Sequence, residues 1–153
     1  MLVERQLEST SNLDPFRKAI LNLMYTGNWV NEKSVEFFKQ YDLTSQQFNI
    51  LRILRGQKGA AINLQDVQER MISKMSNTTR LIEKLRLKNF VTRVQCEENR
   101  RKIEIRITDQ GMNLLSEIDK TISIHETKTT KGLTEDEVIV LNKLLNKLRT
   151  TNK

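Results

Sequence analysis

Four polar residues suited to recognising base edges lie close together near the middle of the sequence. They are spaced by one, three and four positions: Ser76, Asn77, Arg80 and Lys84. On a helix, this spacing places the four side chains on one exposed face. A hydroxyl, an amide and a guanidinium on the first turns of such a helix can enter a major groove and hydrogen-bond to bases. A solvated helix face without a partner would contain the same residues.

A second group of basic residues lies in a polar turn further along the chain. Arg100 and Arg101 separate residues 90–96 from residues 102–108, two runs rich in β-prone residues. In the second run, three isoleucines alternate with polar residues, which predicts a strand with one buried face. Because a hairpin of two strands is marginally stable alone, it must pack on helices. We expect the two arginines at its tip, within reach of a phosphate or a minor groove.

The formal net charge of +7 on this 153-residue chain is concentrated around these two groups. Residues 70–106 hold eleven Lys and Arg against four Glu, so the rest of the chain is balanced. The excess coincides with the predicted helix and hairpin, where a surface facing phosphates would have to lie. It favours double-stranded DNA as the partner. A solvated basic surface gives the same total, and a winged-helix module that binds RNA or protein is the alternative function.

The first group must be positioned by two helices and the turn between them. A helix is predicted over residues 65–71, and Ser73 is the predicted N-cap of the next helix, which puts Lys74 in its first turn. The apolar period of this second helix predicts its buried face: Thr78, Leu81, Ile82 and Leu85. Asn89 tolerates the left-handed conformation and is expected to end the helix.

The preceding helix carries its own start and stop signals. Thr44 and Gln47 form a capping box, and Gly56 and Gly59 are expected to end the helix that follows it. Residues 62–64 are predicted to add a short extended piece before the helix-turn-helix.

A long amphipathic helix is predicted near the N-terminus. Asp14 and Pro15 have the residue types of an N-cap and a first helical position. A heptad seam follows: Phe16, Ile20, Leu23, Gly27, Val30, Ser34, Phe37 and Tyr41. Such a helix spans about 40 Å, more than one small core needs, so part of it is expected to pack on a second subunit. The alternative is a long helix that packs only on its own chain.

Two more amphipathic helices are predicted after the hairpin. Thr108 is the expected cap of the first, and Thr134 with Glu137 forms a capping box before the second. The predicted fold is therefore mainly α with a small β-hairpin, a winged helix-turn-helix of about six helices. Residues 1–42 and 109–153 are the expected dimerisation parts, and residues 43–108 are the expected DNA-binding domain.

From about residue 43 to residue 115, the sequence resembles the MarR family of winged-helix transcriptional regulators. Residues 43–54 are similar to the family's Leu-Thr-x-x-Gln-x-x-Leu-x-x-Leu pattern, and residues 64–71 resemble its first helix-turn-helix helix. Residues 76–85 match the recognition helix. Arg100-Arg101, followed by Ile-Thr-Asp-Gln-Gly at 107–111, resembles the wing and the start of the next helix.

The resemblance implies a homodimer with intertwined terminal helices that binds a pseudo-palindromic operator as a repressor or activator, and a repressor is the predicted role. It assigns Ser76, Asn77 and Arg80 to bases, and Lys74 and Lys84 to phosphates. Arg100 and Arg101 would contact DNA from the wing. Relatives often release DNA when a small, frequently aromatic ligand binds between the dimerisation and DNA-binding parts. Four residues of the first helix are candidates to line such a site, although core packing explains them as well: Met24, Tyr25, Trp29 and Phe38.

Other classes of function lack the residues they need. The chain has one His and one Cys, no glycine-rich phosphate loop and no Cys or His cluster at metal spacing, so we expect no enzyme, cofactor or metal site. Cys96 is a small strand residue or, alternatively, a redox sensor. His125 is expected to pack. The single cysteine and the lack of an apolar run of roughly 20 residues predict a cytoplasmic protein outside the membrane.

Overall fold

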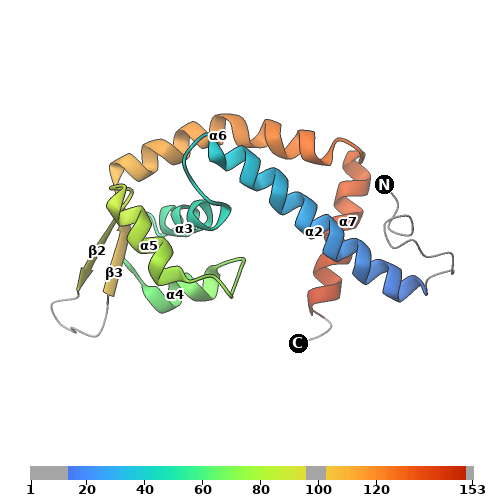
Figure 1. Ribbon diagram of the computed structural model, residues 1–153, viewed down its shortest axis with the longest axis horizontal. Helices are drawn as coiled ribbons and strands as arrows, with labels where there is room; N and C mark the ends of the chain where they lie inside the picture. Colours follow the sequence, from blue (N-terminus) through green and yellow to red (C-terminus); the bar gives the residue numbers. More distant parts are fainter. Residues whose placement is uncertain (1–13, 96–102, 151–153) are drawn as a thin grey trace. The chain divides into compact units, whose positions relative to one another are not determined.

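The computed structural model describes residues 14–95 and 103–150 (Figure 1). The helices are α2 (Pro15–Lys39), α3 (Ser45–Arg55), α4 (Leu64–Arg70), α5 (Thr78–Leu87), α6 (Asp109–Thr130) and α7 (Glu135–Thr150). The strands are β1 (Ile62–Asn63), β2 (Val91–Gln95) and β3 (Ile103–Ile107). The chain forms two compact units, Met1–Asp119 and Lys120–Lys153, with the boundary inside α6. The predicted fold class, a mainly helical winged helix-turn-helix, is confirmed.

Helix α2 begins as its sequence predicts. The Asp14 carboxylate accepts hydrogen bonds from the backbone N–H groups of Phe16 at 3.0 Å and Arg17 at 3.1 Å. Pro15 follows at the first helical position, where its missing N–H costs nothing. Within α2, only Phe37 and Phe38 are buried, and both lie near its C-terminal end. Of the predicted heptad seam, the apolar residues Phe16, Ile20, Leu23 and Val30 are exposed, whereas Ser34 and Tyr41 are half-buried.

The core of the first unit lies among α3, α4, α5, the sheet and the start of α6. Its fully buried side chains repeat on the helical and strand periods expected from the sequence: Ile50, Leu51, Leu54, Val67, Met71, Ile82, Leu85, Ile105, Leu115 and Ile118. Burying each such side chain contributes about 1.5 to 3 kcal/mol. The capping box of α3 is also confirmed, because Thr44 Oγ1 accepts from Gln47 N at 3.1 Å and Gln47 Oε1 accepts from Thr44 N at 2.9 Å.

The sheet has one strand more than the two-stranded wing expected from the sequence. Its order is β1-β3-β2, and both pairs are antiparallel. The short extended piece predicted near residue 62 supplies the additional strand, with Ile62 opposite Ile105. This pairing joins residues far apart in the sequence, so local propensity could not reveal it. Strand β1 ties the start of the helix-turn-helix to the wing.

A close approach of two backbone segments joins the end of α5 to the start of α6. Asn89 takes the left-handed conformation, with φ of 59°, as predicted. Thr108 then donates to two carbonyls of the α5–β2 turn, from its N–H to Phe90 O at 3.1 Å and from its hydroxyl to Asn89 O at 2.7 Å. Its Oγ1 also accepts from Gly111 N at 3.1 Å, which confirms Thr108 as the cap of α6.

The second unit contains the end of α6 and helix α7. The predicted capping box of α7 is confirmed, since Glu137 Oε2 accepts from Thr134 N at 2.7 Å and Thr134 Oγ1 accepts from Glu137 N at 3.3 Å. Hydrogen bonds from the Thr134 backbone, and then from its side chain, lower the pKa of Glu137. None of the residues of α7 is buried. In the described parts of the chain, no helix is long and apolar enough to cross a membrane.

We predict that Gly111→Ala destabilises the first unit by about 2 to 3 kcal/mol, because overpacking against fixed backbone has no cheap relaxation. A Cβ at this position would lie 2.3 Å from Phe90 O and 2.9 Å from a side-chain carbon of Ile107. Urea unfolding of the full chain measures the change. Gly132→Ala is the matched control, since a Cβ there meets no atom within 4 Å. Equal unfolding midpoints for the two variants would contradict the close approach.

Candidate nucleic-acid interface

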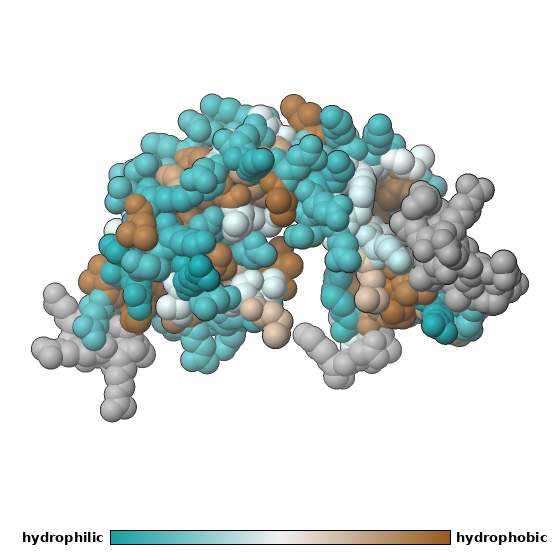
Figure 2. All heavy atoms as spheres, viewed as in Figure 1, coloured by the Kyte–Doolittle hydropathy of each residue, from teal (hydrophilic) through white to brown (hydrophobic). Residues whose placement is uncertain are grey.

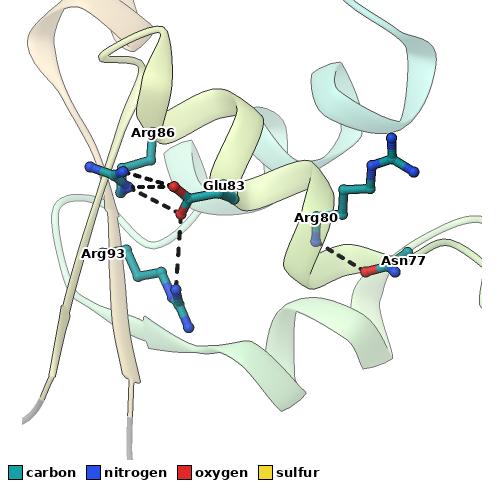
Figure 3. Close-up of polar contacts among 5 residues, drawn as sticks. All are labelled: Asn77, Arg80, Glu83, Arg86 and Arg93. Carbon is teal, nitrogen blue, oxygen red and sulfur yellow. Dashed lines mark hydrogen bonds and ion pairs between the residues drawn. The ribbon is translucent and has the colours of Figure 1, made fainter.

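Helix α5 begins at Thr78, later than the start predicted from Ser73, and Asn77 is its N-cap. The Asn77 side-chain oxygen accepts a hydrogen bond from the backbone N–H of Arg80 at 3.0 Å (Figure 3). Ser73 instead belongs to a turn, in which its carbonyl accepts from Ser76 N at 3.3 Å. The prediction that Ser73 caps the helix is wrong because contacts with α4 hold residues 73–77 outside it.

Two of these contacts come from α4 itself. Gln68 Nε2 donates to the carbonyl of Lys74 at 2.7 Å, and the Lys74 ammonium donates to the carbonyl of Glu69. Gln68 Oε1 also accepts from the hydroxyl of Thr78, the first residue of α5. Gln68 therefore fixes the course of the turn between α4 and α5. Lys74 lies in this turn, not in the first turn of α5, and its ammonium is held against the end of α4.

Arg80 and Lys84 lie on the side of α5 that faces α3. Together with the start of α3, they line a groove of about 330 Å³ whose walls also contain Ser76 and Asn77. The structure therefore brings these four predicted residues together around one groove. Arg80 is exposed, and its guanidinium points away from Glu83 and Arg86 (Figure 3). The groove also includes Gln46 of α3, which the sequence reasoning missed because it considered only the second helix.

The other exposed side of α5 faces the wing and carries residues that the sequence reasoning did not select. Thr79 lines a second groove, of about 660 Å³, with residues of α4 and with Ile103 of β3. Further along the helix, Glu83 Oε1 accepts from Arg86 Nη2 at 2.7 Å, and both of its oxygens accept from Arg86 Nε at 3.1 Å. Arg93 Nη1 of β2 lies 3.9 Å from Glu83 Oε2 (Figure 3).

These contacts shift the pKa values of Glu83 and Arg86. The hydrogen bond from Arg86 is the main cause of a lowered pKa for Glu83, and the charges of Arg86 and Arg93 act in the same direction. The same hydrogen bond raises the pKa of Arg86. Glu83 is therefore ionised at neutral pH and its charge is compensated. The spacing of three between Glu83 and Arg86 was visible in the sequence as a helical ion pair. Arg93 could be added only from the tertiary structure.

Arg100, Arg101 and the candidate redox residue Cys96 lie outside the described residues. Strand β2 ends before this segment and β3 begins after it, with Gln95 paired to Ile103. Among the described residues, no group of three or more His, Cys, Asp or Glu could hold a metal ion.

The four candidates for an effector site lie in different environments. Met24, Tyr25 and Trp29 lie on the exposed part of α2. Phe38 is 5% exposed and packs in the core, with its ring centroid 4.5 Å from that of Phe48. Core packing therefore accounts for Phe38 but not for the other three. His125 is half-buried on α6, as a packing residue would be.

Comparison with known proteins finds similarity to one family of regulators. A model of the MarR family matches residues 43–103, which contain the capping box of α3, the helix-turn-helix and strand β2. The chain is 27% identical over 119 residues to the HTH-type transcriptional regulator SarZ of Staphylococcus epidermidis. That match covers 76% of this chain and 78% of SarZ.

Two solved structures share the fold. A mutant of MarR from E. coli, complexed with operator DNA, has a TM-score of 0.74 at 22% identity, and the match covers 89% of this chain and 99% of that one. BpsR of Bordetella bronchiseptica, whose DNA binding is regulated by 6-hydroxynicotinic acid, has a TM-score of 0.78 at 22% identity, covering 91% and 98%. The family match covers the helix-turn-helix, and the matches to SarZ and to these structures each cover at least three quarters of this chain. Residues 43–103 are therefore similar to the MarR family, whose members are transcription regulators, and the fold is shared with solved structures of that family.

Proposed function

We propose that the protein is a homodimeric repressor that binds a pseudo-palindromic operator, with α5 of each subunit in a major groove. The observation that carries this proposal is the groove beside α5, where Arg80, Lys84 and the Asn77 amide meet at the surface of the first unit. The DNA-bound relative from E. coli supports this use of the fold. A two-fold dimer would present two such helices about one helical turn of DNA apart.

Within this interface, the side chains have different roles. Arg80 is the main base-reading residue, because its long, exposed guanidinium can make two parallel hydrogen bonds to guanine. Ser76 and the Nδ2 group of Asn77 add shorter contacts. Lys84 binds phosphate, and Lys74 does so only after leaving the Glu69 carbonyl. Arg100 and Arg101 extend the interface from the wing.

Exposed apolar residues support the dimer. Large apolar side chains reach the surface in both units (Figure 2), among them Phe16, Ile20 and Met24 on α2 and Ile139, Val140 and Leu144 on α7. Monomeric soluble proteins rarely expose so many large apolar side chains on neighbouring turns. A second copy that covers them would remove this surface from water. Residues 1–42 and 109–153 are accordingly assigned to dimerisation, and residues 43–108 to DNA binding.

A small aromatic ligand is the proposed signal for release. BpsR is regulated by 6-hydroxynicotinic acid, an aromatic carboxylate, and this chain exposes Met24, Tyr25 and Trp29 on α2. Such side chains can cover the faces of an aromatic ring. A ligand would have to bind the DNA-free conformation more tightly than the DNA-bound one.

The test of the proposed function is fluorescence anisotropy with duplexes tiled across the DNA upstream of the protein's own gene, against a shuffled duplex. Selective binding of two chains to a near-palindrome, weakening as salt rises, is the expected result. Weak and equal binding to every duplex would overturn it and favour the RNA- or protein-binding module.

We predict that Arg80→Ala reduces affinity for the preferred duplex by about 1 to 3 kcal/mol and affects shuffled DNA much less, because a base contact is lost. Anisotropy titrations on both duplexes measure the difference. Lys33→Ala is the control, since Lys33 pairs with Glu36 on α2 and lies outside the α5 surface. An equal loss on both duplexes would make Arg80 a phosphate contact instead.

Replacing Asn77 can separate its capping role from its proposed base contact. Asp accepts the Arg80 N–H as Asn does, so Asn77→Asp should retain stability while it loses the amide donor and weakens DNA binding. Asn77→Ala removes the cap as well and should reduce the free energy of unfolding by about 1 kcal/mol. Urea unfolding and anisotropy together measure both effects. Unchanged DNA affinity in Asn77→Asp would leave capping as the role of this side chain.

Charges placed on the exposed apolar faces should separate the subunits. Ile20→Glu and Leu144→Glu are each expected to produce monomers at concentrations where the wild type is a dimer, because an ionised carboxylate would be buried without a partner. Sedimentation equilibrium gives the molecular mass. Ile72→Glu, at an exposed isoleucine of the α4–α5 turn, should leave the dimer intact. A dimer in all three variants would place the interface elsewhere.

A further inference from the structure

Arg93 occupies a position where the strand pattern calls for an apolar residue. It lies directly opposite Ile105 of β3, and directly opposite residues project from the same face of a sheet. Ile105 is fully buried under the helices, and Val91, two positions before Arg93, is buried as well. The Arg93 side chain therefore leaves β2 on the face that packs against helices, and it remains 34% exposed. A charged residue on this face needs a partner on a helix.

Glu83 of α5 is that partner, and it lies between two guanidinium groups. Arg86 approaches from the same helix with Nη2 at 2.7 Å, and Arg93 approaches from the wing with Nη1 at 3.9 Å. A guanidinium has five N–H donors. Arg86 uses Nε and Nη2 toward Glu83, so its Nη1 keeps donors that can bind another anion. Arg93 directs only Nη1 toward Glu83, at 3.9 Å, and its other donors can do the same. Figure 3 shows this Glu83–Arg86–Arg93 cluster on one side of α5 and Arg80 directed away from it.

The net charge of the cluster is positive, although its central residue is acidic. A carboxylate on a helix that approaches DNA would repel phosphates, and the two arginines reverse the sign. The contribution of the cluster to folding is expected to be small, because all three side chains are between a third and a half exposed. Its geometric effect is larger, since Glu83 restricts two long side chains that would otherwise sample many rotamers.

We propose that Arg86 and Arg93 bind DNA phosphates on the wing side of α5, and that Glu83 is the positioning residue that orients them. The inference rests on the proposed DNA binding and adds a backbone contact that connects the recognition helix with the root of the wing. Arg80 reads bases on the other side of the helix. Phosphate contacts carry no sequence information, so this cluster sets the register and strength of binding and leaves sequence preference to Arg80.

The first test compares Arg93→Ala and Arg86→Ala with the wild-type full chain by anisotropy, on the preferred and the shuffled duplex, over a range of salt concentrations. For each variant, the affinity for both duplexes is expected to fall by a similar factor, about tenfold, and the slope of log affinity against log salt to become shallower by about one. An unchanged slope in both variants, with wild-type DNA binding intact, would overturn the proposal.

The second test asks whether replacing Glu83 strengthens or weakens DNA binding. Charge alone predicts that both Glu83→Gln and Glu83→Ala bind DNA more tightly than the wild type, because each removes a negative charge. The positioning role predicts the opposite order: wild type tightest, Glu83→Gln intermediate because it keeps one acceptor for Arg86, and Glu83→Ala weakest. Glu36→Gln on α2 is the control for neutralising a distant carboxylate and should change affinity by less than about twofold. Tighter binding by both Glu83 variants would overturn the positioning role.

These outcomes separate the inference from the proposed function. If the wild type shows no preference for any duplex, and Arg80→Ala has the same DNA affinity as the wild type, the proposed function fails. If the wild type is selective and Arg80→Ala loses that selectivity while Arg86 and Arg93 variants behave as wild type, only the cluster is misassigned. Urea unfolding of the Glu83, Arg86 and Arg93 variants should match that of the wild type closely, because exposed ion pairs contribute little to stability. Arg93→Gln, which keeps a polar side chain, serves as the second variant at the strand position.

Discussion

Helix α5 buries Thr78, Ile82 and Leu85 against α3, α4 and β2, and this packing determines which of its side chains can meet a partner. Three buried positions at intervals of four and three occupy one side of the helix. Two exposed sides remain, one toward α3 with Arg80 and Lys84, and one toward the wing with Thr79 and Glu83. The core holds the helix in place, so the directions in which side chains leave these two sides are fixed.

The two ends of α5 are secured by different means. At the start, the Asn77 side chain caps Arg80 N, and Gln68 of α4 joins the turn to the first helical residue. At the end, Asn89 reverses the chain, and Thr108 hydrogen-bonds to the resulting turn. The Lys88 ammonium also pairs with the Asp42 carboxylate at 2.6 Å, which connects the end of α5 with the segment between α2 and α3.

The charged residues on the two exposed sides of α5 are arranged differently. On the α3 side, the guanidinium of Arg80 is directed toward open groove, which suits a residue that must adapt to base edges. On the wing side, Arg86 hydrogen-bonds to Glu83 and Arg93 lies 3.9 Å from it, which suits groups proposed to meet a regular phosphate backbone. Preorganised donors lose less conformational entropy on binding than free ones. Under the proposed function, one helix would combine a residue that reads bases with residues that contact the DNA backbone.

The sequence by itself determined the mainly helical winged fold, the capping residues Asp14, Thr44, Thr108 and Thr134, and the outward positions of Arg80 and Lys84. These features depend on residues within one or two helical turns of each other, where propensity and periodicity act directly. Only the tertiary structure decided that Asn77 rather than Ser73 caps α5, that Ile62 adds a third strand, that Phe38 belongs to the core, and that Arg93 meets Glu83. Each of these outcomes depends on a contact between different elements. The pattern of residues along the sequence does not show which residue of another element will be in contact.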